Sequence, residues 1–304
     1  MQVAVLMSTY NGEKYIREQI DSILSQIKVN VTLFIRDDGS TDSTVKIITQ
    51  YTEKYSNIRL LVGENIGVGN SFMQLLYSLT DEFDYYAFSD QDDIWLNEKL
   101  ERAIEKISKN TVPTLYVSNQ ILVDKNGRKL GMRYVQKPDL SYMQTLSNNK
   151  ATGCTMLWNK ALNDRLTDIN ARPSKILLDN RIHDVWISAV AGLIGEIVYD
   201  QNGYILYRQH ENNVVGVKKI TVFGTLKSQI EKLVGKKPRN GRSMLAYELI
   251  KGYPETKHEN LLVACANSKQ YRNKWIIIHS RKEIIKHTNE SQIGFALKVL
   301  MNFF

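Results

Sequence analysis

Three aspartates crowd into four positions of the sequence, at Asp90, Asp92 and Asp93. They follow a β-favouring run at 85–88 and precede a helix-patterned segment at 96–107. Ionised carboxylates at the end of a buried strand are costly unless a cation pairs with them. Because Mg²⁺ and Mn²⁺ prefer hard oxygen ligands, this acidic loop predicts a divalent ion that carries a diphosphate. The alternative is a turn whose aspartates cap the next helix.

The elements that must position this loop are strands and helices that alternate along the chain. Short apolar runs predict strands, and apolar residues at helical spacing between them predict helices. The predicted strands cover 3–7, 31–35, 58–62 and 85–88, and the helices cover 15–24, a segment capped by Ser40 or Thr41 and ending near 55, and a segment ending at 79. This alternation is typical of right-handed βαβ units, and it predicts an α/β fold with a mostly parallel sheet flanked by helices.

Polar segments follow the other predicted strands as well. They cover 8–13, 37–42 and 65–70, and all are rich in glycine, hydroxyl or carboxylate side chains. Ligands of parallel α/β sheets bind outside the carboxyl ends of the strands, where such loops gather. Four loops of this kind are less expected by chance than one, so they favour a nucleotide site over a simple capping turn.

The alternation loosens after the acidic loop. The sequence predicts strands over 114–123, 151–158 and 196–199 and a helical segment over 177–193. Gly153 interrupts the second of these strands, which indicates close approach of a ligand to the backbone.

The positive charge of the chain lies in its last segment. Residues 218–304 contain 17 Lys and Arg against 6 Glu and no Asp, whereas the whole chain carries a net charge of +8. We therefore predict a nucleotide-binding domain over 1–217 and a basic helical region over 218–304. The charge predicts contact with an anionic surface such as a membrane, while packing on the main domain is the alternative for apolar faces such as 222–234.

Composition excludes several other classes of protein. Cys154 and Cys265 provide neither a disulfide framework nor a zinc spacing, which favours a reducing compartment. The N-terminus lacks the basic segment of a secretory signal, and no apolar run approaches the roughly 18 to 20 residues that span a bilayer. We expect a cytoplasmic protein, peripheral at the inner face of the cell membrane. Nucleic acid is not an expected partner, because aromatic residues are not interleaved with the basic ones.

Seven short motifs occur in one order along residues 1–215. They are S-T-Y-N-G-E at 8–13, R-D-D-G-S-T-D at 36–42, N-I-G at 65–67, S-D-Q-D-D-I-W at 89–95, A-T-G-C-T-M at 151–156, H-D at 183–184 and L-Y-R-Q-H at 206–210. Their order and spacing resemble those of family 2 glycosyltransferases, and within them the bacterial rhamnosyltransferase-type enzymes of cell-wall and capsular polysaccharide synthesis. The resemblance implies a GT-A fold, a nucleotide-diphosphate sugar donor and inversion at the anomeric carbon.

The resemblance also implies roles for single residues. Asp184 matches the general base that an inverting displacement needs opposite the leaving diphosphate, and a cap for the helix over 185–193 is an alternative compatible with that role. His183 and Trp186 are expected on the acceptor side. Asp92 and His210 are expected to bind Mn²⁺ or Mg²⁺, although a lone histidine after a strand is more often a surface or core residue.

The donor site is implied in the same way. Asp38 resembles the carboxylate that accepts a hydrogen bond from the pyrimidine N–H, and an acidic β-turn is the alternative. The expected donor-binding residues are Ser8, Thr9, Tyr10, Glu13, Asp38, Asn70, Asp90, Gln91, Asp92 and Gly153.

These observations together predict an inverting, metal-dependent glycosyltransferase. Its expected substrates are dTDP-rhamnose and a lipid-linked saccharide, and a UDP-hexose donor (galactose, glucose or N-acetylhexosamine) is the alternative. A nucleotidyltransferase or a nucleotide-binding module would share the acidic loop. The sequence has no Gly-x-x-x-x-Gly-Lys phosphate loop, which disfavours these last two classes.

Overall fold

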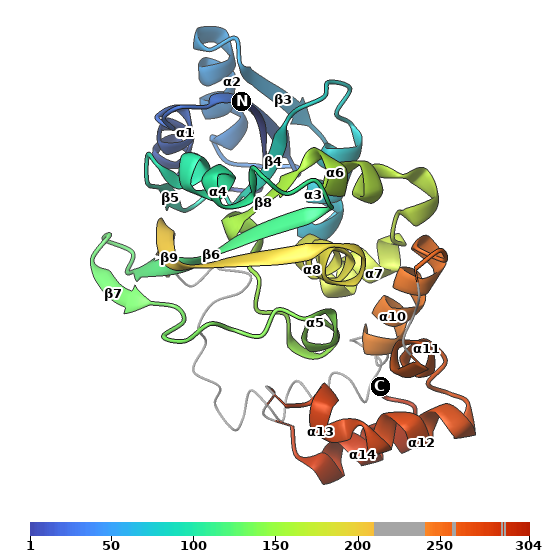
Figure 1. Ribbon diagram of the computed structural model, residues 1–304. Helices are drawn as coiled ribbons and strands as arrows, with labels where there is room; N and C mark the ends of the chain where they lie inside the picture. The colour runs from blue at the N-terminus through green and yellow to red at the C-terminus, as the bar shows by residue number, and fades with distance from the viewer. Residues whose placement is uncertain (210–240, 257–259, 287, 289) are drawn as a thin grey trace.

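The computed structural model describes residues 1–209, 241–256, 260–286, 288 and 290–304 (Figure 1). Four parallel strands form one half of its sheet, in the order β3-β2-β1-β4. These strands are β1 (Gln2–Thr9), β2 (Asn30–Asp37), β3 (Ile58–Val62) and β4 (Tyr85–Ser89), and they are joined by α1 (Ile16–Leu24), α2 (Thr44–Lys54) and α3 (Val68–Tyr77). The predicted βαβ alternation is confirmed. The predicted cap of α2 is wrong, because the helix begins at Thr44 after Ser43 rather than after Ser40 or Thr41.

The other half of the sheet mixes strand directions. Strand β8 (Met156–Asn159) lies antiparallel between β4 and β6 (Thr114–Val123), and β9 (Glu196–Arg208) runs parallel to β6. Strands β5 (Ile94–Trp95) and β7 (Lys129–Met132) pair antiparallel with β9 and β6. The strand predicted over 151–158 is shorter than expected, because its first half forms the 3₁₀ turn η1 (Gly153–Thr155).

Helices cover both faces of the sheet, as the alternation of side chains along β1 requires. Val3, Val5 and Met7 belong to one core cluster with α1, α2 and α4, whereas Ala4 and Leu6 belong to a second cluster with α3 and α8. The remaining helices are α4 (Lys99–Ile107), α5 (Tyr142–Asn148), α6 (Lys160–Thr167), α7 (Lys175–Arg181), α8 (His183–Ile194) and the 3₁₀ turn η2 (Ile169–Ala171). The sequence therefore forms an α/β fold with helices on both sides, as predicted.

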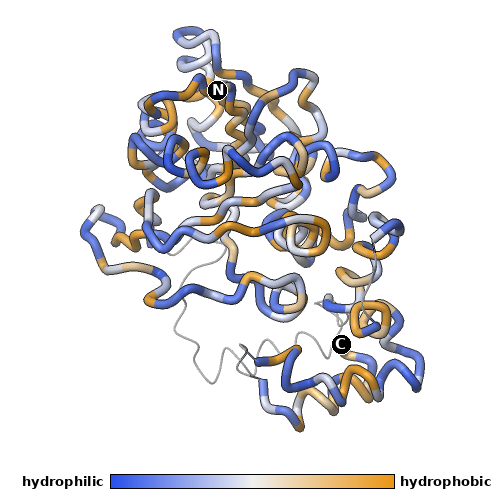
Figure 2. Tube along the Cα trace, in the orientation of Figure 1, coloured by the Kyte–Doolittle hydropathy of each residue, from blue (hydrophilic) through white to orange (hydrophobic). Residues whose placement is uncertain are grey.

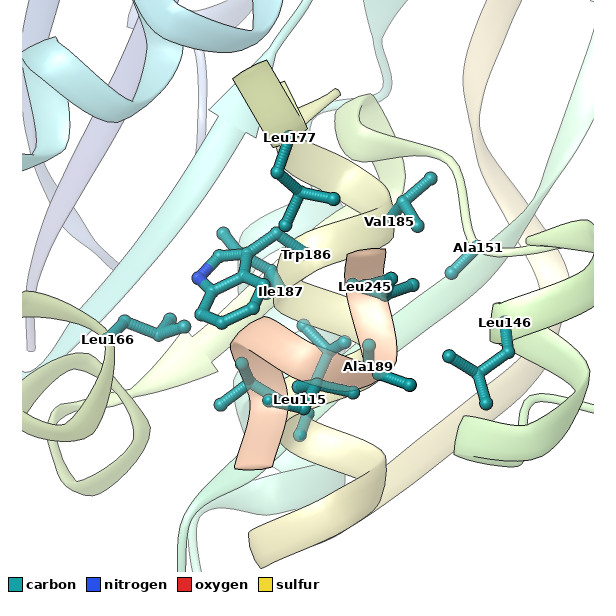
Figure 3. Packing of buried hydrophobic residues seen from close by; sticks show 14 of the residues in the cluster. Leu115, Leu146, Ala151, Leu166, Leu177, Val185, Trp186, Ile187, Ala189 and Leu245 are labelled. Atoms are coloured by element: carbon teal, nitrogen blue, oxygen red, sulfur yellow. The ribbon is translucent and has the colours of Figure 1, made fainter. Parts of the chain in front are cut away.

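The C-terminal region is helical, as its pattern predicts. It contains α10 (Gly241–Gly252), α11 (Asn260–Ala266), α12 (Tyr271–His279), α13 (Arg281–Ile284) and α14 (Gln292–Leu300). Figure 3 shows Leu245 of α10 beside α8, and Ala246 and Leu249 are buried in the same cluster. These helices therefore share a core with the sheet. The boundary expected at 217/218 and the apolar stripe over 222–234 lie outside the described residues.

Figure 2 shows hydrophobic stretches along the central strands and along several of the helices that cover them. In the part of the chain that the structure describes, no helix has both the length and the apolar character needed to cross a bilayer.

Candidate active site

The carboxyl ends of β1 and β4 form a topological switch point, because the chain continues to β2 on one side of β1 and reaches β4 on the other. The loops after these strands are joined by one side chain. Gln91 Oε1 accepts the backbone N–H of Tyr10 (2.9 Å), and Gln91 Nε2 donates to the Tyr10 carbonyl (3.0 Å). Both ends of the Gln91 amide therefore hold the acidic loop against the loop after β1.

A second set of contacts organises the loop after β2. Asp37 accepts hydrogen bonds from Thr9 Oγ1 (3.0 Å) and from the backbone of Ser40 (2.8 Å). Asp38 forms a buried ion pair with Arg36, and it accepts the backbone N–H groups of Ile66 (2.9 Å) and Gly67 (3.0 Å). The two carboxylates therefore connect the ends of β1, β2 and β3, and Asp37 also closes the turn after β2 through the backbone N–H groups of Gly39 and Ser40.

The acidic loop places two carboxylates beside a thiol. Ligand atoms of Asp90, Asp93 and Cys154 all lie within 4.8 Å of one another. Burial and the charges of Asp92 and Asp184 raise the pKa of Asp90 to about 7. Burial, followed by the charges of Asp92 and Asp90, raises the pKa of Asp93 well above its usual value. Among the described residues, the buried Oδ2 of Asp93 has no hydrogen-bond partner. The two carboxyl groups are therefore costly to ionise where they lie.

The side chains of Lys99 and Arg208 lie close to this cluster. Lys99 is buried with its Nζ 3.7 Å from the centre of the Trp95 ring, and burial lowers the pKa of Lys99 to about 7 despite the opposing effect of Asp93. Arg208, at the end of β9, donates through Nε to the Asp92 carbonyl (3.0 Å) and through Nη2 to Glu18 (2.6 Å), and its backbone N–H donates to Asp93 Oδ1 (3.3 Å). Arg208 thus fixes the backbone of the acidic loop and does not present its charge to a phosphate.

The first turn of α8 brings another carboxylate to the same place. Asp184 is buried, and its charge contributes to the raised pKa of Asp90. The preceding His183 ring stacks on Phe72 at a centroid distance of 4.0 Å and meets Phe88 edge-on at 4.9 Å. Burial lowers the pKa of His183 to about 3, so the imidazole is neutral at physiological pH. A neutral ring packed in this way fixes the start of α8 and hence the position of Asp184.

Gly153 of η1 completes this arrangement. A Cβ atom at this position would lie 2.7 Å from His183 Nε2 and 3.6 Å from the Cβ of Asp184. Only glycine allows η1 to approach α8 so closely, and η1 also carries Cys154 into the acidic cluster. The site therefore combines a carboxylate cluster suited to a hard cation with a further carboxylate at a helix start, beside it.

Comparison with known proteins identifies the class of protein. The sequence profile described as glycosyl transferase family 2 matches residues 4–166 of the chain. The chain is also 34% identical over 215 residues to the dTDP-rhamnosyl transferase RfbG of Shigella flexneri. The matched region covers 69% of this chain and 73% of that protein. The chain belongs to glycosyl transferase family 2.

Other relatives of this family 2 glycosyltransferase are more distant. The UDP-Glc:alpha-D-GlcNAc-diphosphoundecaprenol beta-1,3-glucosyltransferase WfgD of Escherichia coli is 31% identical over 147 residues, covering 48% of this chain and 55% of that protein. The crystal structure of S. aureus TarS 1–349 in complex with UDP-GlcNAc superposes with a TM-score of 0.60 at 16% identity, covering all of this chain and 80% of that one. The likeness to TarS confirms the GT-A fold.

The expected donor residues of this glycosyltransferase occupy one edge of the sheet, with different exposure. Tyr10 is about half exposed (48%), whereas Ser8 bonds its hydroxyl to Ser71 (2.6 Å) and Glu13 accepts the backbone N–H of Ser43 (2.9 Å). Asn70 is buried and donates to Asp179 (2.5 Å) and to the carbonyl of Ile66. Asn70 therefore ties α3 to α7, and its expected contact with the donor stays a prediction.

Both residues expected on the acceptor side are buried in this glycosyltransferase. The Trp186 indole is 0% exposed and lies in the core near Tyr253, and His183 lies between Phe72 and Phe88. Both side chains pack in the core in this structure, and their expected contact with an acceptor stays a prediction. Asp184 is also not the helix cap, since α8 begins at His183. His210, an expected metal ligand, lies outside the described residues.

Sequence reasoning gave no individual role to four residues that shape the site, although Asp93 was part of the predicted acidic loop. Asp93, Lys99 and Cys154 build the buried part of the acidic cluster, and Arg36 orders the loops after β2 and β3. The sequence could have drawn attention to Lys99, because a positive charge in the first turn of a helix is disfavoured by the helix dipole and indicates a compensating interaction nearby. No local pattern indicates the proximity of Cys154, because it depends on η1 folding back toward β4.

We predict that Gly153→Ala lowers the free energy of unfolding by about 1–3 kcal/mol, because its methyl group overlaps His183 Nε2. Urea unfolding measures the effect. In the double variant with His183→Ala, the two losses should not add, since the smaller side chain leaves room for the methyl group. Strict additivity would contradict the close approach.

We also predict that His183 makes the protein less stable at mildly acidic pH. Its folded pKa lies below the unfolded value of 6.5, so as the pH falls below 6.5 only the unfolded state takes up the proton. From pH 7 to pH 5 this group removes about 2 kcal/mol of stability. His183→Gln should reduce the pH dependence of urea unfolding by that amount, whereas His279→Gln, at an exposed histidine, should leave it unchanged. Equal pH dependence in wild type and His183→Gln would refute the assignment.

Proposed function

We propose that this glycosyltransferase inverts the anomeric centre of a sugar that it takes from a nucleotide-diphosphate donor. The observation that carries the proposal is the convergence of Asp184 with the acidic loop at the switch point of the sheet. Donor phosphates need charge compensation on one side, and the acceptor hydroxyl needs a base on the other. The two sets of carboxylates supply these functions from different elements, β4 and α8.

The acidic loop fits a divalent cation, Mn²⁺ or Mg²⁺. Asp93 Oδ2 is buried without a hydrogen bond in the described part of the chain, and burial together with the charge of Asp92 raises the pKa of both Asp90 and Asp93. Burial raises the pKa of Cys154 as well, so its sulfur is a neutral thiol, and hard oxygen ligands suit Mn²⁺ or Mg²⁺. We propose that Asp92 binds the ion with support from Asp90. When bound, the ion neutralises the charge that grows on the leaving diphosphate.

We propose Asp184 as the general base. It would accept the proton of the acceptor hydroxyl as that oxygen attacks the anomeric carbon, and the nucleotide diphosphate would leave from the opposite face. The neutral His183 ring stacked on Phe72 holds the first turn of α8 in place, and Gly153 leaves the space beside Asp184 open. Pre-organisation of this kind supports efficient proton transfer.

The nucleotide is proposed to lie over the loops after β1 and β2. Tyr10 is exposed there, and the acidic loop is fixed beside it by Gln91. Oδ1 of Asp38 accepts hydrogen bonds from Arg36 and from the backbone N–H of Ile66, which fills both of its acceptor positions. Among the described residues, Oδ2 accepts one hydrogen bond, from the backbone N–H of Gly67. The remaining position of Oδ2 supports Asp38 as the acceptor for a pyrimidine N–H.

The proposed donor is dTDP-rhamnose and the proposed acceptor is a lipid-linked saccharide of surface polysaccharide synthesis. The likeness to RfbG over 69% of the chain supports the donor. The likeness to WfgD, a glucosyltransferase for a diphosphoundecaprenol-linked sugar, supports a lipid-linked acceptor and keeps a UDP-hexose as the second candidate donor. Such an acceptor would place the enzyme at the cytoplasmic face of the cell membrane.

We predict that dTDP-rhamnose with Mn²⁺ raises the melting temperature of the protein more than UDP-glucose, UDP-galactose or UDP-N-acetylhexosamines do. A ligand that binds only the folded state stabilises it in proportion to the logarithm of concentration over Kd. Thermal-shift measurements with and without Mn²⁺ check this. A larger response to a UDP-sugar would replace the donor and keep the mechanism, and no response to any nucleotide sugar would refute the function.

We predict that Asp184→Asn lowers the transfer rate by about 10²–10⁴-fold while the donor Kd changes by less than about twofold, because the base acts only on the acceptor. Asp92→Ala should instead weaken donor binding in the presence of Mn²⁺ by about tenfold or more. Calorimetry and initial-rate assays separate the two effects, with exposed Asp81→Asn as the control. Loss of donor affinity in Asp184→Asn would exclude it as the base.

A further inference from the structure

Helix α14 carries hydrophobic residues on its exposed side. Ile293, Leu297, Leu300 and Met301 are all exposed, and their spacing of four, seven and eight residues puts them on one side of the helix. The opposite side is formed by the fully buried Phe295 and Val299, with the same core as the sheet. A surface helix normally turns polar residues outward. This helix is apolar on both sides, so its outer side needs a partner.

Helix α12 adds aromatic side chains next to α14. Lys274 Nζ donates to the carbonyl of Leu300 (2.9 Å), which joins the two helices directly. Tyr271 and Trp275 are exposed and pack edge-to-face with a centroid distance of 6.2 Å. Figure 1 shows α12, α13 and α14 grouped at the end of the molecule remote from β1–β3, and Figure 2 shows hydrophobic stretches along α12 and α14.

The same segment is strongly basic. Residues 269–304 contain seven Lys and Arg and two Glu, which gives 7 − 2 = +5. One of these glutamates, Glu290, is already paired with Arg242 and Lys298. Lys282 and Lys286, between α12 and α14 in the chain, are exposed. Apolar and aromatic side chains flanked by basic ones are the composition of helices that lie in a membrane interface.

We propose that the face formed by α12 and α14 docks on an anionic lipid surface. We call it the C-terminal apolar face, and it consists of Tyr271, Trp275, Ile293, Leu297, Leu300 and Met301. The exposed aliphatic side chains would enter the boundary between headgroups and acyl chains, the two aromatic rings would lie at headgroup level, and the lysines would meet lipid phosphates. Both helices have nine residues, well short of the roughly 20 that span a bilayer.

The charge distribution favours lipid over the other occupants of such a face. A second copy of the chain would bring the same basic segment against this one, and like charges at an interface oppose association. Nucleic acid would use the lysines and the rings but would leave the aliphatic stripe of α14 in water. This inference rests on the proposed function, because a lipid-linked acceptor requires the enzyme to work at a membrane surface.

Vesicle sedimentation of the full chain tests the proposal. Wild type should bind vesicles of phosphatidylglycerol and phosphatidylcholine, bind pure phosphatidylcholine much more weakly, and lose affinity as salt rises. Ile293→Ser and Leu297→Ser should each weaken partitioning by about tenfold if the side chain leaves water on binding. The matched control is Ile169→Ser, because Ile169 is 74% exposed, close to the 77% of Ile293, and lies outside the face. The control should bind as wild type does.

Three results would overturn the proposal. They are absence of binding to anionic vesicles, equal weakening in Ile169→Ser and Ile293→Ser, and a concentration-dependent dimer that Leu297→Ser abolishes, which would assign the face to a second copy. The donor thermal shift of Ile293→Ser, measured in parallel, separates this proposal from the proposed function. If Ile293→Ser loses vesicle binding but keeps its response to the donor, the variant is folded and the face binds lipid. Vesicle binding by wild type without any donor response would refute the function and leave the lipid face standing.

Discussion

Electrostatic repulsion among carboxylates is the constraint on which the rest of the site depends. Asp90 and Asp93 come from one loop and Asp184 from another element, and burial removes the water that would screen them. Lys99 gives only partial relief, since burial lowers its own pKa to about 7. Such a cluster persists only because the surrounding fold is stable enough to hold it. Full ionisation of these carboxyl groups is therefore unfavourable in the structure as it stands.

The fold holds the cluster through contacts between loops that are distant in sequence. Gln91 ties the acidic loop to Tyr10, and Arg208 ties it to β9. Asp38 and Arg36 form a buried ion pair whose other hydrogen bonds order the loop after β3. A buried pair contributes little net stability, but it fixes geometry when all its polar atoms are satisfied. Several residues of the donor motifs therefore hold the loops of the site in place, and fewer residues of these motifs are exposed to solvent.

The sequence predicted the scaffold better than the direction in which side chains point. Strands β3 and β6 begin and end where the apolar runs predict. In β6 the cause is burial on both faces, whereas β3 lies at the edge of the sheet and is more exposed. Motif order located Asp184 and the acidic loop. It did not predict that Trp186 and His183 are buried, because α8 is apolar nearly all round and its pattern does not tell one side from another. The grouping of Asp93 with Cys154 depends on η1 and β8 folding back against β4, which no local pattern encodes.

The same core that positions Asp184 also fixes the C-terminal helices. Trp186 and Ile187 of α8 share a hydrophobic cluster with Leu245 of α10 (Figure 3). Phe295 of α14 belongs to the same cluster. Because close-packed interiors transmit position rather than absorb it, the C-terminal apolar face has a defined orientation relative to α8. A face that docks on lipid would then set the height and tilt of the carboxylate cluster above the membrane. Trp186 contributes to this shared core, because its indole is buried and its ring centroid lies 6.3 Å from that of Tyr253, directly after α10.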